Sequence, residues 1–346
     1  MEKIYMTDIR EELKNRNNPI VLYGTGNGAD RLIDDLNAHK IAISGIFASG
    51  GFVRKRTFRG FEVLSFEELY ERFPDMTVLM CFGSDRREVR ENIDRISSRV
   101  ELLFPEYPVY GDNIFTREFF EKHRGELEFV RSRLADRLSR DTFDDVINFR
   151  LSGKLNYLFS CESDDVPEPE NTNGAVFLDL GAYNGDTALS FAEKYPDYGE
   201  IIAAEPDKRS FKKLVSNTAE LKNTRCINAA AGDVDGTVFA DDKKGRGTHS
   251  GSGSTEICSF TVDRLFEGEN RPIIIKVDIE GSELEFIHGA ESVIRNKKPA
   301  LKIACYHRSE DLFTLPRAVL DIRDDYKLFM RHKNGVPSWN TDFYFI

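Results

Sequence analysis

Glycines and carboxylates stand together at two places in this chain, each directly after an apolar run. The first run, at residues 175–180, leads into a turn that contains Gly181 and Gly185. Asp179 lies just before this turn, where its carboxylate can accept a hydrogen bond from a cationic amine or from a backbone loop. Glu205 ends the next apolar run, and an acid about 20 residues after a glycine-rich turn is spaced to bind ribose hydroxyls. Together these residues indicate a nucleoside ligand, whereas the glycines alone would indicate only a tight turn.

The residue types do not choose between NAD and S-adenosylmethionine, which both contain adenosine. The turn reads Asp-x-Gly-x-x-x-Gly rather than the Gly-x-Gly-x-x-Gly of dinucleotide sites. With its leading acid, it suits a cofactor that has no pyrophosphate. The residues expected to bind the cofactor are Asp179, Gly181, Ala182, Tyr183, Asn184, Gly185, Asp186, Thr187, Glu205, Pro206 and Asp207.

The second place follows the apolar run at residues 273–278. Asp278, Glu280 and Glu283 fall within six residues around Gly281. Bringing three carboxylates together raises their mutual repulsion, so we expect a cation, a base role or a strong hydrogen-bond donor nearby. Glu280 and Glu283 are also ordinary residues for the first turn of a helix, where acids interact favourably with the helix dipole.

A histidine ends the next apolar run along the chain. Asp278 and His307 would then end neighbouring strands and face the crevice beyond the strand ends, where ligands bind in doubly wound sheets. The acids should raise the pKa of the imidazole by favouring its charged form. We predict His307 as the general base and Asp278 as the residue that positions the acceptor or the cofactor, without a metal. The alternative is that Asp278 and Glu280 hold a divalent cation.

Two α/β units and a helical connector are expected to position these residues. Strand and helix patterns alternate over residues 1–110, which predicts a Rossmann-like N-terminal domain with a parallel sheet. Residues 111–172 carry apolar residues at helical spacing and end in a segment rich in prolines and acids, which predicts a helical connector and a linker. Residues 173–346 form the second α/β domain. Its predicted strands are AVFLDL, EIIAAE, RCINAA, IIIKVD, ALKIACY, YKLFMR and DFYFI, the last two forming an antiparallel hairpin.

The composition excludes some classes of function. The chain has 346 residues, with 48 Lys and Arg against 59 Asp and Glu, and a net charge of −11. This charge argues against nucleic-acid binding, which needs surplus cations. No apolar run approaches the roughly 20 residues that cross a bilayer, so no membrane span is expected. Five scattered cysteines without a CxxC pair indicate reduced core thiols and a cytoplasmic protein. The sequence does not define an oligomeric state.

Four segments of the chain resemble FkbM-type methyltransferases, and they occur in the order of that family. They are VFLDLGAYNGDTALSF, AAEPD, IIIKVDIEGSELEFIHGA and YHRSEDL. The third carries the pattern Lys-x-Asp-x-Glu-Gly-x-Glu followed by Gly-Ala, at Lys276, Asp278, Glu280, Gly281, Glu283, Gly289 and Ala290. The resemblance covers about residues 175–346.

This resemblance implies a class I methyltransferase sheet with a C-terminal antiparallel hairpin, S-adenosylmethionine as cofactor, and O-methylation of a sugar or polyketide hydroxyl. It places Asp179, Gly181, Gly185 and Asp186 on the methionine side of the cofactor, and Glu205 on its ribose. We expect a small-molecule or glycan acceptor, such as a nucleotide-linked or lipid-linked sugar. The N-terminal domain resembles the small Rossmann-like domain of nucleotide-sugar-modifying enzymes.

Two alternative hypotheses assign the chain to other classes of protein than a methyltransferase. The first is a nucleotide-sugar oxidoreductase that uses Gly24, Gly26 and Ala29 as a dinucleotide fingerprint. This fingerprint lacks the acid that would bind the ribose at the end of the next strand, where the chain has Phe-Ala-Ser at residues 47–49. The second is a non-catalytic, cofactor-binding scaffold whose N-terminal domain docks a glycosyltransferase.

Overall fold

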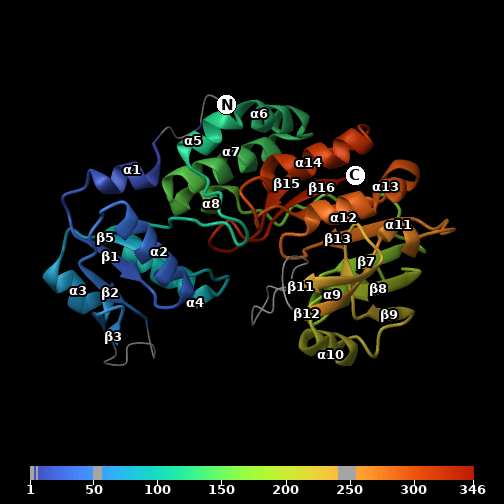
Figure 1. Cartoon of the computed structure of the whole chain (residues 1–346), viewed down its shortest axis with the longest axis horizontal. Helices are drawn as coiled ribbons and strands as arrows, with labels where there is room; N and C mark the ends of the chain where they lie inside the picture. Colours follow the sequence, from blue (N-terminus) through green and yellow to red (C-terminus); the bar gives the residue numbers. More distant parts are fainter. Residues whose placement is uncertain (1–3, 5–6, 50–56, 241–254) are drawn as a thin grey trace.

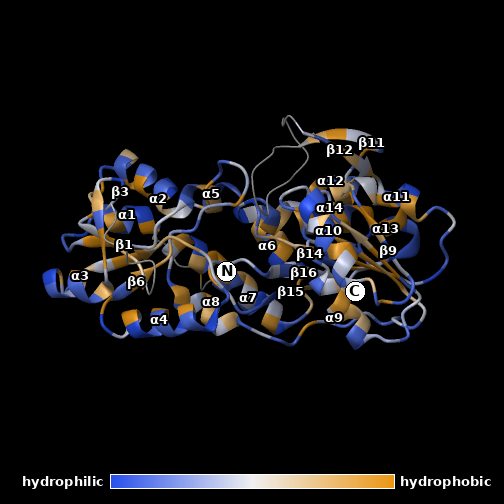
Figure 2. Ribbon diagram, turned by 90° about the horizontal axis from the view of Figure 1, so that it is seen from below, coloured by the Kyte–Doolittle hydropathy of each residue, from blue (hydrophilic) through white to orange (hydrophobic). Residues whose placement is uncertain are grey.

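The computed structural model describes residue 4 and residues 7–49, 57–240 and 255–346. It contains two mostly parallel sheets with a group of helices between them (Figure 1). Hydrophobic residues gather in the strands and on the inner faces of the helices (Figure 2). The predicted α/β class with parallel sheets is confirmed.

The C-terminal sheet has seven strands in the order β15-β16-β14-β13-β7-β8-β9. The five strands from β14 to β9 are parallel, and β16 pairs antiparallel with both β14 and β15. This is the predicted doubly wound sheet closed by a C-terminal hairpin. The strands are β7 (Val176–Leu180), β8 (Glu200–Ala204), β9 (Thr224–Ile227), β13 (Ile273–Val277), β14 (Ala300–Ala304), β15 (Leu328–His332) and β16 (Thr341–Phe345).

Helices follow the strands of this sheet. They are α9 (Asp186–Lys194), α10 (Lys208–Asn217), α11 (Val262–Leu265), α12 (Glu283–Gly289), α13 (Glu291–Lys297) and α14 (Asp311–Ile322). A small sheet that the sequence analysis did not predict lies beside them, with β10 (Ala230–Ala231), β12 (Thr255–Phe260) and β11 (Gly236–Ala240) in that order. The predicted helix over residues 282–295 is divided into α12 and α13 at Ala290.

The N-terminal sheet has the order β3-β4-β2-β1-β5-β6. Its strands are β1 (Ile20–Tyr23), β2 (Gly45–Phe47), β3 (Thr57–Phe58), β4 (Phe61–Leu64), β5 (Thr77–Met80) and β6 (Glu101–Leu103), and its helices are α1 (Ile9–Lys14), α2 (Asn27–Ala38), α3 (Phe66–Arg72) and α4 (Arg87–Ser97). Helix α3 begins with the predicted capping box, in which Ser65 and Glu68 satisfy each other's backbone N–H groups. The strands β3 and β4 were not predicted.

Four helices connect the two sheets: α5 (Arg117–Lys122), α6 (Arg124–Arg133), α7 (Arg137–Ser152) and α8 (Leu155–Cys161). Helix α7 is mostly buried and packs against β15 (Figure 1). Its Ser139 hydroxyl accepts the backbone N–H of Met330 at 3.1 Å. The side chain of Arg331 also donates to the Ser139 hydroxyl, at 2.7 Å. The connector is therefore part of the folded core.

Three cysteines, Cys81, Cys161 and Cys305, are buried as expected, whereas Cys226 is partly buried and Cys258 is exposed. All five are free thiols. Over the described part of the chain, no helix has both the length and the apolar character that a membrane crossing requires.

Candidate active site

A pocket of about 320 Å³ opens at the carboxyl ends of β7, β8, β13 and β14. Its volume lies within the usual range of small-molecule sites. Parallel strands bring their following loops to one edge of the sheet, so segments far apart in the sequence meet here. The lining residues include Gly181, Tyr183, Asp186, Thr187, Glu205, Pro206, Asp207, Ser210, Lys276, Asp278, Glu280, Lys302, Tyr306, Asn340 and Asp85.

The pocket brings together eight of the predicted site residues. Seven of these were assigned to the cofactor: Gly181, Tyr183, Asp186, Thr187, Glu205, Pro206 and Asp207. The eighth, Asp278, was predicted to position the acceptor or the cofactor. The predicted residues that do not line it are Asp179, Ala182, Asn184, Gly185 and His307.

Glu205 joins the loops that follow β7 and β8. Its carboxylate accepts the backbone N–H of Tyr183 on one oxygen and the backbone N–H of Asp207 on the other, both at 2.8 Å. Burial raises the pKa of Glu205, while these two N–H groups act in the opposite direction. Each carboxylate oxygen has two lone pairs, so each can still accept one hydroxyl from a ligand in the pocket.

Asp179 is fully buried in the middle of the sheet and contacts a lysine of the next strand. The Lys276 ammonium lies 3.2 Å from the Asp179 carboxylate and donates to the carbonyls of Leu180 and Gly181 at 3.2 and 2.9 Å. Burial disfavours the charge on Lys276, but the carboxylates of Asp179 and Asp278 raise the pKa of its ammonium group. Asp179 thus acts on the turn after β7 through Lys276, which corrects the expectation that it faces the ligand.

The two predicted glycines of the turn are explained by packing against protein rather than by approach of a ligand. A Cβ at Gly181 would lie 1.8 Å from the backbone oxygen of Asp278. A Cβ at Gly185 would lie 2.8 Å from Thr218 and 3.0 Å from Leu214. Both glycines have positive φ, of 72° and 87°, which glycine adopts without steric cost. They therefore allow this turn to lie close to the loops after β13 and around α10.

Asp278, Tyr306 and Lys302 form the other side of the pocket. The Tyr306 hydroxyl donates to the Asp278 carboxylate at 2.9 Å, and the Lys302 ammonium lies 3.1 Å from Asp342. Burial raises the pKa of Asp278, but Lys276, His307 and the Tyr306 hydrogen bond together lower it. Lys302 and Tyr306 were not among the predicted site residues. The signal for Lys302 was a lysine inside the apolar run ALKIACY, where a charge needs a specific partner.

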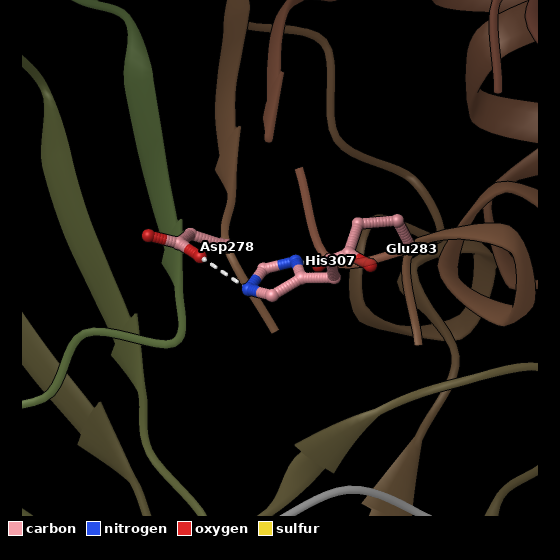
Figure 3. A group of neighbouring side chains, drawn as sticks. All are labelled: Asp278, Glu283 and His307. Carbon is pink, nitrogen blue, oxygen red and sulfur yellow. Dashed lines mark ion pairs between the residues drawn. The ribbon is translucent and has the colours of Figure 1, made fainter. Parts of the chain in front are cut away.

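His307 lies behind the pocket, with a side chain that has no exposed surface. Its Nδ1 is 3.0 Å from Glu283, and its Nε2 is 3.4 Å from Asp278 (Figure 3). Its Nε2 is also 3.5 Å from Glu280. Burial disfavours the charged imidazole, but these carboxylates outweigh it and raise the pKa of His307 to about 10. A buried, protonated imidazole cannot take a proton from an acceptor in the pocket, so this geometry does not support the predicted role of His307 as the base.

The N-terminal sheet unit reaches the pocket through the loop after β5. Ser84 and Val336 exchange two backbone hydrogen bonds, at 2.8 and 3.1 Å. Gly83 packs on the indole of Trp339, where a Cβ would lie 2.5 Å from the ring. This contact holds Asp85 at the pocket wall, near Asn340 of the loop before β16.

Among the described residues, aromatic side chains fill the space at the carboxyl ends of β1 and β2. The rings of Tyr23 and Phe47 stack with their centroids 4.7 Å apart, and the Tyr23 hydroxyl lies 3.1 Å from the Ser49 hydroxyl. The cavity beside them has a volume of about 80 Å³. Small-molecule sites have volumes of about 300–1,000 Å³. The small volume of this cavity argues against the oxidoreductase hypothesis.

The order of glycines, acids and lysines around this pocket matches a known family. The sequence pattern described as "Methyltransferase FkbM domain" matches residues 179–327. Residues 179–327 form an FkbM methyltransferase domain. The resemblance stated from the sequence is therefore confirmed for this part of the chain.

Two known proteins are similar to this chain, one over almost its whole length and the other over a shorter segment. The crystal structure of a methyltransferase FkbM from Methylobacillus flagellatus KT has a TM-score of 0.72 and 22% sequence identity, and the match covers 98% of this chain and 93% of that chain. The fold is thus shared over the N-terminal unit, the connector and the FkbM domain. A hexuronic acid methyltransferase, AglP, from Haloferax volcanii is 27% identical over 130 residues, which is 35% of this chain. The match spans about half of that relative, at 52% of its length.

Proposed function

We propose that this protein is an S-adenosylmethionine-dependent O-methyltransferase that acts on a sugar hydroxyl. One observation carries the proposal: a single pocket joins the turn after β7 and Glu205 to Asp278, Tyr306 and Lys302. Hydroxyls of a polyol both donate and accept hydrogen bonds, so this mixture of a carboxylate, a phenol and an ammonium suits them. The name of the similar protein from Haloferax volcanii, a hexuronic acid methyltransferase, supports a sugar acceptor.

The residues on the first side of the pocket fit the cofactor. Glu205 offers carboxylate lone pairs toward the pocket while its backbone partners hold it in place, which suits the two hydroxyls of a ribose. Gly181 and Asp186 line the same wall and would face the amino-acid part. When bound, S-adenosylmethionine supplies a methyl group on a positively charged sulfur.

The residues on the second side must orient an acceptor hydroxyl and take its proton. Asp278 is the carboxylate that faces this side from the end of β13, and Tyr306 holds one of its oxygens. The other oxygen points away from His307 and can accept a proton from the acceptor (Figure 3). Neighbouring cations lower the pKa of Asp278 and so keep its carboxylate ionised. We propose that this carboxylate, which is in place at the pocket, accepts the proton while the methyl group is being transferred.

Calorimetry and a methyl-transfer assay test this proposal. We expect the full chain to bind S-adenosylmethionine but not NADH, and to transfer a labelled methyl group to glucuronic acid or UDP-glucuronic acid. Binding of NADH without S-adenosylmethionine would favour the oxidoreductase. Binding of S-adenosylmethionine without methylation of any sugar would favour the scaffold hypothesis.

Replacing Glu205 with alanine is expected to weaken S-adenosylmethionine binding. The change removes the carboxylate that holds the loops after β7 and β8 and that faces the ribose. The expected loss is about 1–3 kcal/mol of cofactor affinity, the cost of leaving buried polar partners unpaired. Calorimetry measures the affinity, and Glu200→Ala, at the start of the strand that leads to Glu205 and away from the pocket, serves as the control. Equal affinities in both variants and wild type would remove Glu205 from the cofactor site.

Replacing Asp85 with asparagine is expected to raise the KM for the sugar acceptor and to leave S-adenosylmethionine affinity unchanged. Asp85 is the carboxylate that the N-terminal unit contributes to the pocket wall. Loss of one hydrogen bond to a charged group should raise KM by about tenfold or more. Asp75→Asn, in the exposed loop before β5, is the matched control. If Asp85→Asn changes only the cofactor affinity, the assignment to the acceptor side fails.

A further inference from the structure

We propose that Asp278, Glu280 and Nε2 of His307 form a binding site for a divalent metal ion at the floor of the pocket. Nε2 lies 3.4 Å from Oδ1 of Asp278 and 3.5 Å from Oε2 of Glu280. Two ligand atoms that each lie about 2.1 Å from one ion stand about 3.0–3.4 Å apart for angles between a right angle and a tetrahedral one. Each of the two distances from Nε2 lies at or just above this range, so a movement of tenths of an ångström would let Nε2 share an ion with either carboxylate.

Glu283 belongs to this site as the partner of the histidine rather than as a ligand. The two nitrogens of an imidazole point in different directions, so one ion cannot bind both. Glu283 faces Nδ1 at 3.0 Å, on the opposite side of the ring from Asp278 (Figure 3). A carboxylate on Nδ1 is the usual arrangement behind a metal-binding histidine, because it fixes the ring and makes Nε2 a better ligand.

The burial of His307 is the observation that points to a ligand beyond the acidic residues themselves. The imidazole is completely buried, and its Nδ1 is paired with Glu283, whereas Nε2 has no hydrogen-bond partner within the described parts of the chain. Its Nε2 faces the two carboxylates that line the pocket. A buried polar atom normally has a partner, and an ion between Nε2 and these carboxylates would supply one.

The charges around the imidazole also favour a dication over a proton. Asp278, Glu280 and Glu283 surround the ring, and the buried carboxyl of Asp311 interacts with Glu283 and His307. On the far side, Tyr110 contributes a ring and a backbone N–H, which donates to the His307 carbonyl at 2.9 Å. Arg308 donates its Nε to the Gly281 carbonyl rather than to these carboxylates. Lys276 and Lys302 act on Asp278, and Arg150 acts on Asp311, so these cations balance part of the negative charge. A divalent ion in place of the imidazolium proton adds one further positive charge.

The donor set indicates which ions the site would bind. One imidazole nitrogen with two carboxylates suits first-row ions such as Mn²⁺, Fe²⁺ or Zn²⁺ better than Ca²⁺, which prefers oxygen ligands alone. The Asp278 and Glu280 side chains are 36% and 26% exposed, so the ion can enter from the pocket. Further ligand positions would face the pocket.

The role of the ion rests on the proposed methyltransferase function, but its binding does not. An ion beside Asp278 would lower the pKa of an acceptor hydroxyl that it contacts. The hydroxyl proton would pass to the second oxygen of Asp278 while the acceptor oxygen forms a bond to the methyl carbon. The carbon–sulfur bond of the bound cofactor would break at the same time, with its electron pair left on sulfur. The ion would therefore assist the same proton transfer that we assign to Asp278.

Binding of Mn²⁺ to the full chain tests the site directly. After removal of bound ions with EDTA and exchange into EDTA-free buffer, free Mn²⁺ is measured by its electron paramagnetic resonance signal during titration. We expect one Mn²⁺ per chain, and Glu280→Gln should weaken binding by about 10–100-fold or more, because it removes a charged ligand. Asp85→Asn, another carboxylate of the pocket wall, should leave Mn²⁺ affinity unchanged.

The result is interpretable because Glu280 is partly exposed and its replacement keeps the side chain's size. If Glu280→Gln nevertheless lowers the melting temperature, Asp278→Asn provides a second variant with the same expected loss of Mn²⁺ affinity. Failure of the wild type to bind Mn²⁺ at millimolar concentration, or equal binding by all variants, would overturn the site. Calorimetry with S-adenosylmethionine on the same sample separates this outcome from failure of the proposed function.

Discussion

Asp278→Asn is expected to lower kcat for sugar methylation by about 10²–10⁴-fold, the usual range for loss of a general base. The asparagine has the same shape and can still accept the Tyr306 hydroxyl, but it cannot take up the acceptor proton. Asp278 follows β13 and Glu205 follows β8, and these two strands lie on either side of β7 in the sheet. The affinity for S-adenosylmethionine should therefore change little. Steady-state kinetics with the best acceptor of the wild type measure kcat, and calorimetry measures cofactor affinity.

Two further variants show whether this loss belongs to the carboxylate. Tyr306→Phe removes one hydrogen bond to Asp278 and leaves the carboxylate in place. It should cost about tenfold or less, in line with one hydrogen bond. Asp85→Asn should act on KM rather than on kcat. A kcat for Asp278→Asn that stays within tenfold of the wild type would show that another group takes the proton.

The sequence was sufficient to predict most of both sheets, because buried parallel strands are continuous apolar runs. The runs at residues 175–180 and 273–278 became β7 and β13, and the two final runs became the hairpin of β15 and β16. The strand β12 (Thr255–Phe260) was missed because most of its side chains are exposed or partly exposed, so its residues form no apolar run.

The position of the pocket could also be predicted from the sequence, whereas the role of each residue in it could not. Glu205 was found from its spacing, and it lines the pocket. Asp179 has equally favourable spacing. Its side chain, however, contacts that of Lys276, the residue paired with it on the neighbouring strand, and does not line the pocket. A sequence shows which residues end a strand, but the alternation of side chains that decides which face each one meets depends on the exact register.

The complete burial of His307 could not be predicted from the sequence, for a different reason. Its place after β14 was predicted, and the increase in its pKa by neighbouring acids was expected from their number. What buries the ring is a segment far away in the sequence: Tyr110, whose backbone N–H donates to the His307 carbonyl and whose ring lies against Gly281. Long-range contacts of this kind leave no local pattern.

Lys276→Met is expected to destabilise the folded chain strongly. The side chains of Lys276 and Asp179 are 9% and 0% exposed, so removing the ammonium leaves a buried carboxylate without its counter-charge. Breaking a buried ion pair in this way costs about 3–5 kcal/mol. The carbonyls of Leu180 and Gly181 also lose their donor, which loosens the turn after β7. Thermal unfolding measures the loss of stability, and calorimetry measures the accompanying loss of S-adenosylmethionine affinity.

The double variant Asp179→Val/Lys276→Met separates these two effects. Replacing both charges with apolar side chains removes the uncompensated carboxylate, and such replacements are often neutral or stabilising. We therefore expect the double variant to recover most of the melting temperature of the wild type. It should not recover cofactor affinity, because no ammonium holds the Leu180 and Gly181 carbonyls. A double variant as unstable as Lys276→Met would show that the lysine stabilises the sheet by packing and not by its charge.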